Sequence, residues 1–126
     1  MVSDKNSTER RRFRRVPFKA KVTVTTPRHQ WSVWVVDISL KGMLFEEPAA
    51  WPEGTQDCDV ELELGEQNLI RTAGRVVRRF GGLMGYEWSS MDLDSLVDLR
   101  RLLELNLGDP ELVERDIASL FRAHSE

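Results

Sequence analysis

The sequence predicts a mainly β domain of six strands followed by C-terminal helices. One reason is that β-branched and aromatic residues gather in short runs between Val22 and Trp88, separated by segments that contain glycine or proline. Another is a change of period after Asp92, where apolar residues recur at helical spacing. Length also matters, because 126 residues can bury one hydrophobic core but not two.

The six predicted strands are assigned in chain order from these runs. They cover residues 22–25, 31–38, 43–45, 58–64, 69–79 and 83–88. In the fourth, Val60, Leu62 and Leu64 alternate with acidic residues, which is the pattern of a strand with one buried face. Gly81 and Gly82 separate the last two strands and predict a hairpin. Strands of this length at hairpin spacing predict a small antiparallel barrel or a sandwich.

Two helices are predicted after Asp92. The first has an apolar stripe that should pack on the strands, formed by Leu93, Leu96, Leu99, Leu103 and Leu107. Gly108 is expected to end this helix, and Asp109 followed by Pro110 is expected to begin the second. We expect both helices to complete the core of a monomer. The alternative is that part of this apolar surface docks on a partner or on a second copy.

Charge is distributed unevenly along the chain. Residues 1–29 contain nine Lys or Arg and two acidic residues, whereas the remaining 97 residues contain nine basic and nineteen acidic residues. The contrast indicates an anionic partner at the basic end and argues against a general affinity of the body for nucleic acid. The single cysteine, Cys58, excludes an intramolecular disulfide and a cysteine-based zinc site, and its alternating context predicts a buried thiol.

The sequence offers no sign of a membrane segment or of catalysis. No run approaches the ~18–20 apolar residues that span a bilayer, and the N-terminus has no apolar signal-peptide core. We therefore expect a cytoplasmic protein with no membrane partner. The only histidines, His29 and His124, lie far from Ser39 in the sequence and form no cluster with carboxylates. We therefore expect no enzymatic activity, catalytic residue, metal or cofactor.

Two short segments carry the chemistry of an anion-binding site. Residues 10–15 place five arginines around Phe13, and arginine pairs bidentately with phosphate and with the O6/N7 edge of guanine. Asp37, Ser39 and Gly42 follow at fixed offsets where the second predicted strand ends. Asp37 can accept hydrogen bonds from a guanine, and Gly42 admits a close approach to the main chain or a turn with positive φ. The structural alternative for Asp37 is an acid that only satisfies the turn.

These segments resemble the PilZ domain, a bacterial receptor for cyclic di-GMP, whose signature is RxxxR followed by [D/N]xSxxG. Residues 11–15 fit the first half and residues 37–42 the second, and the likeness extends over roughly residues 9–123. The resemblance implies a six-stranded antiparallel barrel that binds cyclic di-GMP. The residues expected to bind this ligand are Arg10, Arg11, Arg12, Arg15, Asp37, Ser39, Gly42 and Arg78.

Two of these residues depend on the resemblance alone. Arg78 is included because a residue on this later strand can pack against a guanine in PilZ domains; the alternative is an exposed charge on an edge strand. Arg10 directly precedes the RxxxR motif. An extra arginine at that position is associated in PilZ domains with an intercalated pair of cyclic di-GMP molecules, so we expect two ligands per chain.

The arginine run also predicts how the chain is organised. We expect residues 1–15 to be a flexible basic arm and residues 16–126 to be the barrel domain, with helices from about residue 92. Because the arm has few apolar residues, it should become ordered only when the ligand neutralises its arginines, which changes the surface offered to an unidentified downstream protein. The alternative is a basic-arm module that binds nucleic acid or protein and has no dinucleotide ligand.

Overall fold

The computed structural model of this chain describes residues 13–65 and 68–125, with side chains as far as Ser119. Within these residues there are seven strands and two helices. The strands are β1 (Val16–Pro17), β2 (Lys21–Thr25), β3 (Gln30–Ile38), β4 (Gly42–Glu46), β5 (Asp57–Glu63), β6 (Leu69–Phe80) and β7 (Leu83–Met91). The helices are α2 (Leu93–Leu107) and α3 (Pro110–Ser125).

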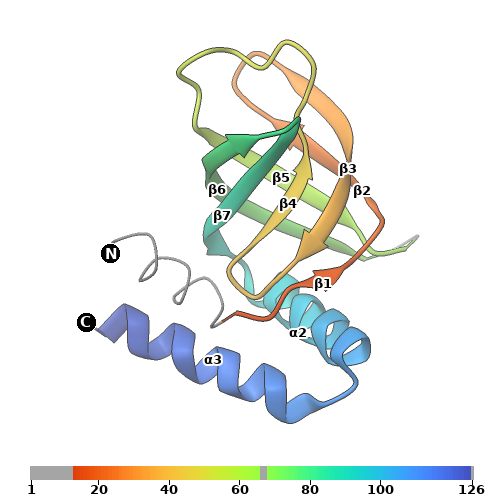
Figure 1. The fold of residues 1–126 in the computed structure, drawn as a ribbon, viewed down its shortest axis with the longest axis vertical. Helices are drawn as coiled ribbons and strands as arrows, with labels where there is room; N and C mark the ends of the chain where they lie inside the picture. The colour runs from red at the N-terminus through yellow and green to blue at the C-terminus, as the bar shows by residue number, and fades with distance from the viewer. Residues whose placement is uncertain (1–12, 66–67, 126) are drawn as a thin grey trace.

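Six of the strands close into an antiparallel barrel, which confirms the predicted fold class (Figure 1). The order around the barrel is β3, β2, β5, β6, β7 and β4, and β4 pairs again with β3. Closure removes the unpaired edges that an open sheet would expose. The short strand β1 lies outside the barrel and pairs with the end of β3, with Val16 opposite Ile38 and Pro17 opposite Asp37. The sequence did not predict β1, because two residues cannot display a period.

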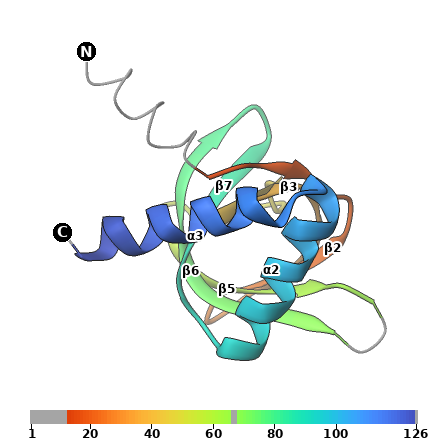
Figure 2. The same cartoon turned by 90° about the horizontal axis from the view of Figure 1, so that it is seen from below.

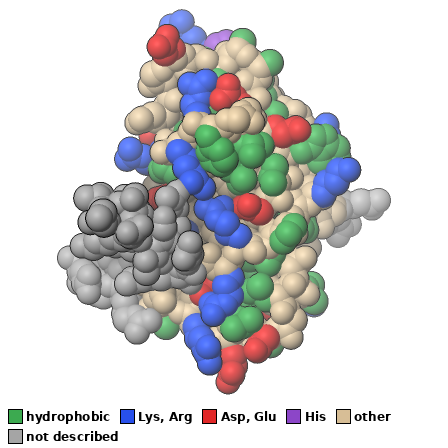
Figure 3. Space-filling model, viewed as in Figure 1, with side chains coloured by type: hydrophobic (Ala, Val, Ile, Leu, Met, Phe, Trp, Pro, Cys, Tyr) green, Lys and Arg blue, Asp and Glu red, His purple; other side chains and the backbone are tan. Residues whose placement is uncertain are grey.

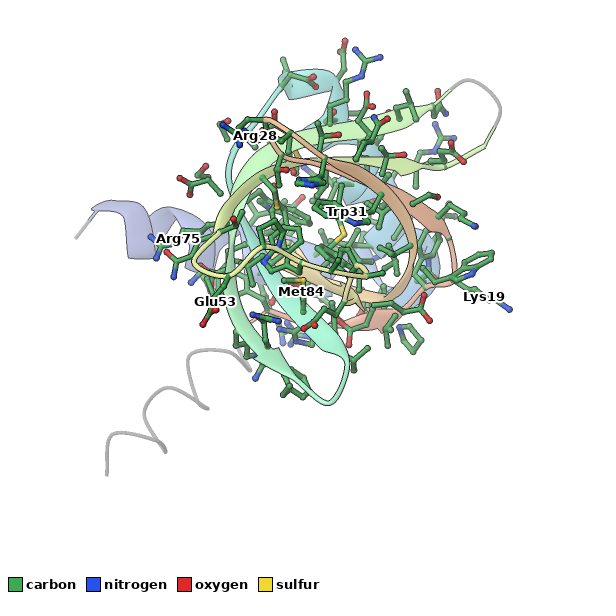
Figure 4. All side chains as sticks on the ribbon, turned by 90° about the horizontal axis from the view of Figure 1, so that it is seen from above. Lys19, Arg28, Trp31, Glu53, Arg75 and Met84 are labelled. Carbon is green, nitrogen blue, oxygen red and sulfur yellow. The ribbon has the colours of Figure 1, made fainter. Side chains whose placement is uncertain are left out.

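Alternate positions of the strands fill the barrel interior. Val22 and Val24 of β2, for example, are both fully buried. In a view along the barrel from above, Trp31 and Met84 lie within the ring of strands (Figure 4). The labelled charged side chains lie around the outside of the ring: Lys19, Arg28, Glu53 and Arg75.

Tyr86 is among the largest fully buried side chains, and its hydroxyl group has partners in the core. The hydroxyl lies 3.1 Å from Thr72 Oγ1 and donates to the carbonyl oxygen of Cys58 at 3.1 Å. Gly74 leaves room for this ring, since a Cβ there would lie 2.7 Å from the Tyr86 hydroxyl oxygen. Cys58 is itself buried, as predicted, and burial raises the pKa of its thiol to about 12. The thiol is therefore protonated and unreactive at neutral pH.

The helix α2 covers the lower end of the barrel (Figure 2). Asp92 caps its first turn by accepting from the Ser95 backbone N–H at 2.6 Å, and Gly108 ends it with a φ of 74°. The predicted apolar stripe is wrong at its beginning, because Leu93 and Leu96 are 74% and 38% exposed. The side chains that α2 buries are Ser95, Leu99, Leu102 and Leu103.

A hydrogen bond explains why α2 is rotated relative to the prediction. The Ser95 hydroxyl accepts from the backbone N–H of Arg71 on β6 at 2.9 Å, so this polar residue faces the barrel. Leu93 and Leu96 point away from that face because successive helical residues are turned by about 100°. In α3, Val113 is buried in the core while Pro110 and Glu111 are exposed. No helix in the described ranges is both long enough and apolar enough to span a bilayer.

Candidate ligand-binding site

The turn between β3 and β4 is built by Ser39 and Gly42. The Ser39 backbone N–H donates to the carbonyl oxygen of Gly42 at 2.8 Å. The Ser39 hydroxyl oxygen also accepts from the N–H groups of Lys41 and Gly42, both at 3.3 Å. Ser39 is only 3% exposed, and it belongs to the turn because β3 has already ended at Ile38. Its hydroxyl holds the turn in shape beside the pocket described below.

Gly42 is required by packing between strands. It pairs with Glu87 where β4 runs antiparallel to β7. A Cβ at Gly42 would overlap the carbonyl oxygen of Tyr86 and lie 3.1 Å from Glu87 Cα. Gly42 does not have a positive φ, which excludes one of the two explanations considered for this glycine. The glycine is explained by the close approach of two backbones.

The pairing of β1 with β3 brings Arg15 beside Asp37. Arg15 directly precedes β1, whose Pro17 lies opposite Asp37. Arg15 Nη1 donates to Asp37 Oδ1 at 2.8 Å, and the two side chains are 38% and 21% exposed. Among the described residues the partner of Asp37 is thus Arg15 of the arginine segment, which differs from the turn groups considered as its structural alternative. An anion or a guanine arriving here would meet a guanidinium already held in place.

Arg78 reaches the same region from β6. It pairs with Gly85 of β7, where a Cβ would lie 3.0 Å from Arg78 Cγ, so the missing side chain makes room for the arginine. The Arg78 guanidinium carbon lies 4.9 Å from the centre of the Phe80 ring, a cation–π contact. Because β6 lies between β5 and β7 in the barrel, Arg78 is not a charge on an edge strand.

These residues surround a pocket of about 350 Å³ on the outside of the barrel. It is lined by Phe13, Arg15, Ser39, Lys41, Gly42, Val77, Arg78, Gly85, Tyr86 and Glu87. Three of the lining side chains are cationic and one is acidic, so the pocket favours an anion. Its volume is within the range of ~300–1,000 Å³ that small-molecule sites occupy. On the face that has β4 and β7 toward the viewer, Lys and Arg side chains form a row (Figure 3).

The structure thus brings together four of the eight predicted site residues around one pocket: Arg15, Ser39, Gly42 and Arg78. Asp37 does not line the pocket but pairs with Arg15, which does. The predictions for Arg10, Arg11 and Arg12 lie outside the described residues.

Sequence reasoning missed Lys41, Glu87 and Trp88. Lys41 Nζ lies 5.7 Å from the centre of the Phe13 ring and 3.9 Å from Glu87 Oε2. Trp88 holds the turn, because its indole N–H donates to the carbonyl oxygen of Leu40 at 2.7 Å. Lys41 lies within residues 37–42, so the second motif could have indicated it. Glu87 and Trp88 reach the site only because β7 pairs with β4.

A larger pocket elsewhere on the barrel has the opposite charge. It measures about 590 Å³ and is lined by Thr25, Asp59, Val60, Glu61, Arg71, Thr72, Ala73, Ser90, Met91 and Asp92. Its one cation, Arg71, is already paired with Glu61 at 3.0 Å. An excess of carboxylates would repel a phosphate, so volume alone does not identify the anion site. Among the described residues, no group of three or more His, Cys, Asp or Glu side chains is placed to hold a metal ion.

The comparison with known families agrees with these observations. The PilZ domain model matches residues 9–105, a range that contains every predicted site residue. Similar solved structures include the PilZ domain of CeSA from a cellulose-synthesizing bacterium, with a TM-score of 0.57 and 17% identity over 75% of this chain and 96% of that one. The PilZ domain of YcgR from Escherichia coli, solved with cyclic di-GMP, has a TM-score of 0.60 and 15% identity over 77% and 91%.

A third similar structure is the inhibitor of motility MotI/DgrA from Bacillus subtilis. Its TM-score is 0.60 at 19% identity, and the match covers 73% of this chain and 51% of that one. At such identities the three structures establish the likeness of fold, while the family match depends on the sequence itself.

Proposed function

Because this chain belongs to the PilZ family, a family of cyclic di-GMP receptors, we propose that it binds cyclic di-GMP in the pocket beside the β3–β4 turn and does not alter it. The observation that carries the proposal is the meeting of Arg15, Lys41 and Arg78 around this pocket. A cyclic dinucleotide presents two phosphates and two guanine edges, and guanidinium groups pair bidentately with both.

Each residue of the pocket has a proposed role. Arg15 forms a bidentate contact with a phosphate or a guanine, and Arg11, the first arginine of the RxxxR motif, does the same. Asp37 accepts from a guanine N–H once Arg15 is engaged by the ligand. Arg78, which lies over the Phe80 ring in this structure, stacks its flat guanidinium on a guanine base. Ser39 and Gly42 shape the turn against which the ligand lies.

The output we propose is a change of surface near the N-terminal arm. Residues 13–15 already contact the barrel and α3, so the ordering we propose concerns residues 1–12. Ligand phosphates neutralise their arginines, and this segment then offers a different surface to a downstream protein. The charge balance supports this proposal, because residues 1–29, which include the arginine segment, are strongly basic while the rest of the chain is acidic.

Calorimetry can separate this proposal from the nucleic-acid alternative. We expect cyclic di-GMP to bind with saturable heat near physiological salt. A short DNA duplex should bind weakly, with an affinity that falls steeply as salt is raised. Saturable binding of the duplex without any binding of cyclic di-GMP would favour the basic-arm module instead.

The stoichiometry of the same titration tests the role proposed for Arg10. We expect two molecules of cyclic di-GMP per chain, because the extra arginine before the RxxxR motif can flank a stacked pair of ligands. Arg10→Ala should shift the ratio toward one. Arg28→Ala is a matched control, since it removes an exposed charge from the same basic segment, residues 1–29. Saturation of the unmodified protein at one ligand per chain would contradict the prediction.

A further inference from the structure

The helix α3 contacts the middle of the arginine motif, although it lies outside residues 9–105 that the family model matches. The backbone N–H of Arg14 donates to Asp116 Oδ2 at 2.8 Å. The Arg14 guanidinium donates to Asp116 Oδ1 at 2.6 Å and to the carbonyl oxygen of Leu112 at 3.4 Å. In two perpendicular views α3 runs beside the segment that leads into β1 (Figures 1 and 2). The helix therefore holds both the main chain and the side chain of one motif residue.

Burial makes this contact important for both partners. The Asp116 side chain is only 5% exposed, and the hydrogen bonds that its carboxylate accepts within the described part of the chain come from Arg14. A buried carboxylate is costly unless it is paired and hydrogen-bonded. The docking of α3 thus depends on the position of Arg14, and the position of Arg14 depends on α3.

The neighbours of Arg14 lie at the ligand pocket. Phe13 is 6% exposed and lines the ligand pocket, and Arg15 lines the same pocket. The three residues are consecutive and β1 begins directly after them, so the position of Arg14 constrains the side chains on either side of it. Fixing Arg14 against α3 therefore directs the side chains of Phe13 and Arg15 toward the pocket.

We propose that Asp116 is a positioning residue for the ligand site and acts through Arg14 to present Arg15 to the pocket. The inference rests on the proposed function, and it adds a regulatory link to it. If docked α3 favours the ligand-binding arrangement of residues 13–15, then bound ligand favours docked α3 by the same factor. Whatever draws α3 away from the barrel lowers the affinity for cyclic di-GMP.

The test is a double-mutant cycle on the affinity for cyclic di-GMP. Asp116→Asn keeps the shape of the side chain and removes its charge, and we expect it to weaken binding about 5-fold or more. In an Arg15→Ala background the same substitution should have little further effect, because the residue it positions is gone. Glu114→Gln is the matched control: it removes a charge from the exposed face of α3, where Glu114 pairs with Arg100, and should leave the affinity unchanged.

Amide exchange gives a second readout that needs no substitution. Saturating cyclic di-GMP should slow exchange at residues 111–119 of the unmodified protein, and this measurement tests the inference if Asp116→Asn does not fold. Equal affinities of Asp116→Asn and the unmodified protein would overturn the inference. An equal loss in both backgrounds, or unchanged exchange in α3, would also overturn it. Absence of binding to the unmodified protein would instead refute the proposed function.

Discussion

Arg15→Ala is expected to weaken the binding of cyclic di-GMP by about 10-fold or more. Arg15 lines the pocket, and its pairing with Asp37 at 2.8 Å holds the guanidinium there before a ligand arrives. A charge-assisted contact with a phosphate or a guanine contributes about 1.5–3 kcal/mol. Losing that free energy lowers the affinity by about 10-fold or more. Arg15→Lys should also weaken binding, because an ammonium group cannot form the bidentate contact. Isothermal titration calorimetry measures both effects.

The control for Arg15→Ala is Arg71→Ala. Arg71 also forms a partly exposed pair with a carboxylate, Glu61, at 3.0 Å, but it lines the acidic pocket. Exposed pairs contribute little to stability, so both variants should melt close to the unmodified protein. Only Arg15→Ala should lose affinity. An equal loss of affinity in both variants would mean that binding depends on the overall charge of the protein and not on this pocket.

Gly42→Ala is expected to destabilise the barrel by about 3 kcal/mol or more. The new Cβ would overlap the carbonyl oxygen of Tyr86 and press against Glu87 Cα, which are both backbone atoms of β7. Side chains can rotate away from such an overlap, but here β4 would have to separate from β7. Urea unfolding monitored by tryptophan fluorescence measures the loss.

Gly85→Ala provides the comparison, because its Cβ would meet a flexible side chain. The nearest atom would be Arg78 Cγ at 3.0 Å, and Arg78 can move. We expect this variant to remain nearly as stable as the unmodified protein while binding cyclic di-GMP more weakly, since Arg78 is displaced in the pocket. If Gly42→Ala proves as stable as Gly85→Ala, then packing does not explain the glycine of the second motif.

The features that were predictable from sequence are those with a local pattern. Alternation in β5 and the glycines between β6 and β7 predict strands because each signal involves residues close in the chain. The caps of α2 are local as well, since Asp92 bonds Ser95 and the Gly108 N–H donates to the carbonyl oxygen of Glu104. Two short motifs likewise indicated the region of the pocket.

What could not be predicted depends on partners far apart in the chain. The rotation of α2 is set by a hydrogen bond from the Arg71 N–H to Ser95, which no periodicity within the helix reveals. Arg14 and Asp116 are separated by 102 positions, and the sequence around Asp116 shows only an amphipathic helix. From the sequence, Gly42 is interpreted as a turn residue. Only the pairing of β4 with β7 shows that it approaches the backbone of β7.

The central claim is that cyclic di-GMP binds in the pocket beside the β3–β4 turn, and a heteronuclear NMR titration tests it most directly. At saturation the backbone amide resonances of Lys41, Gly42, Val77 and Glu87 should shift, while those of Glu61 and Ala73 in the acidic pocket should not. Shifts confined to the acidic pocket, or no shifts at millimolar cyclic di-GMP, would contradict the account.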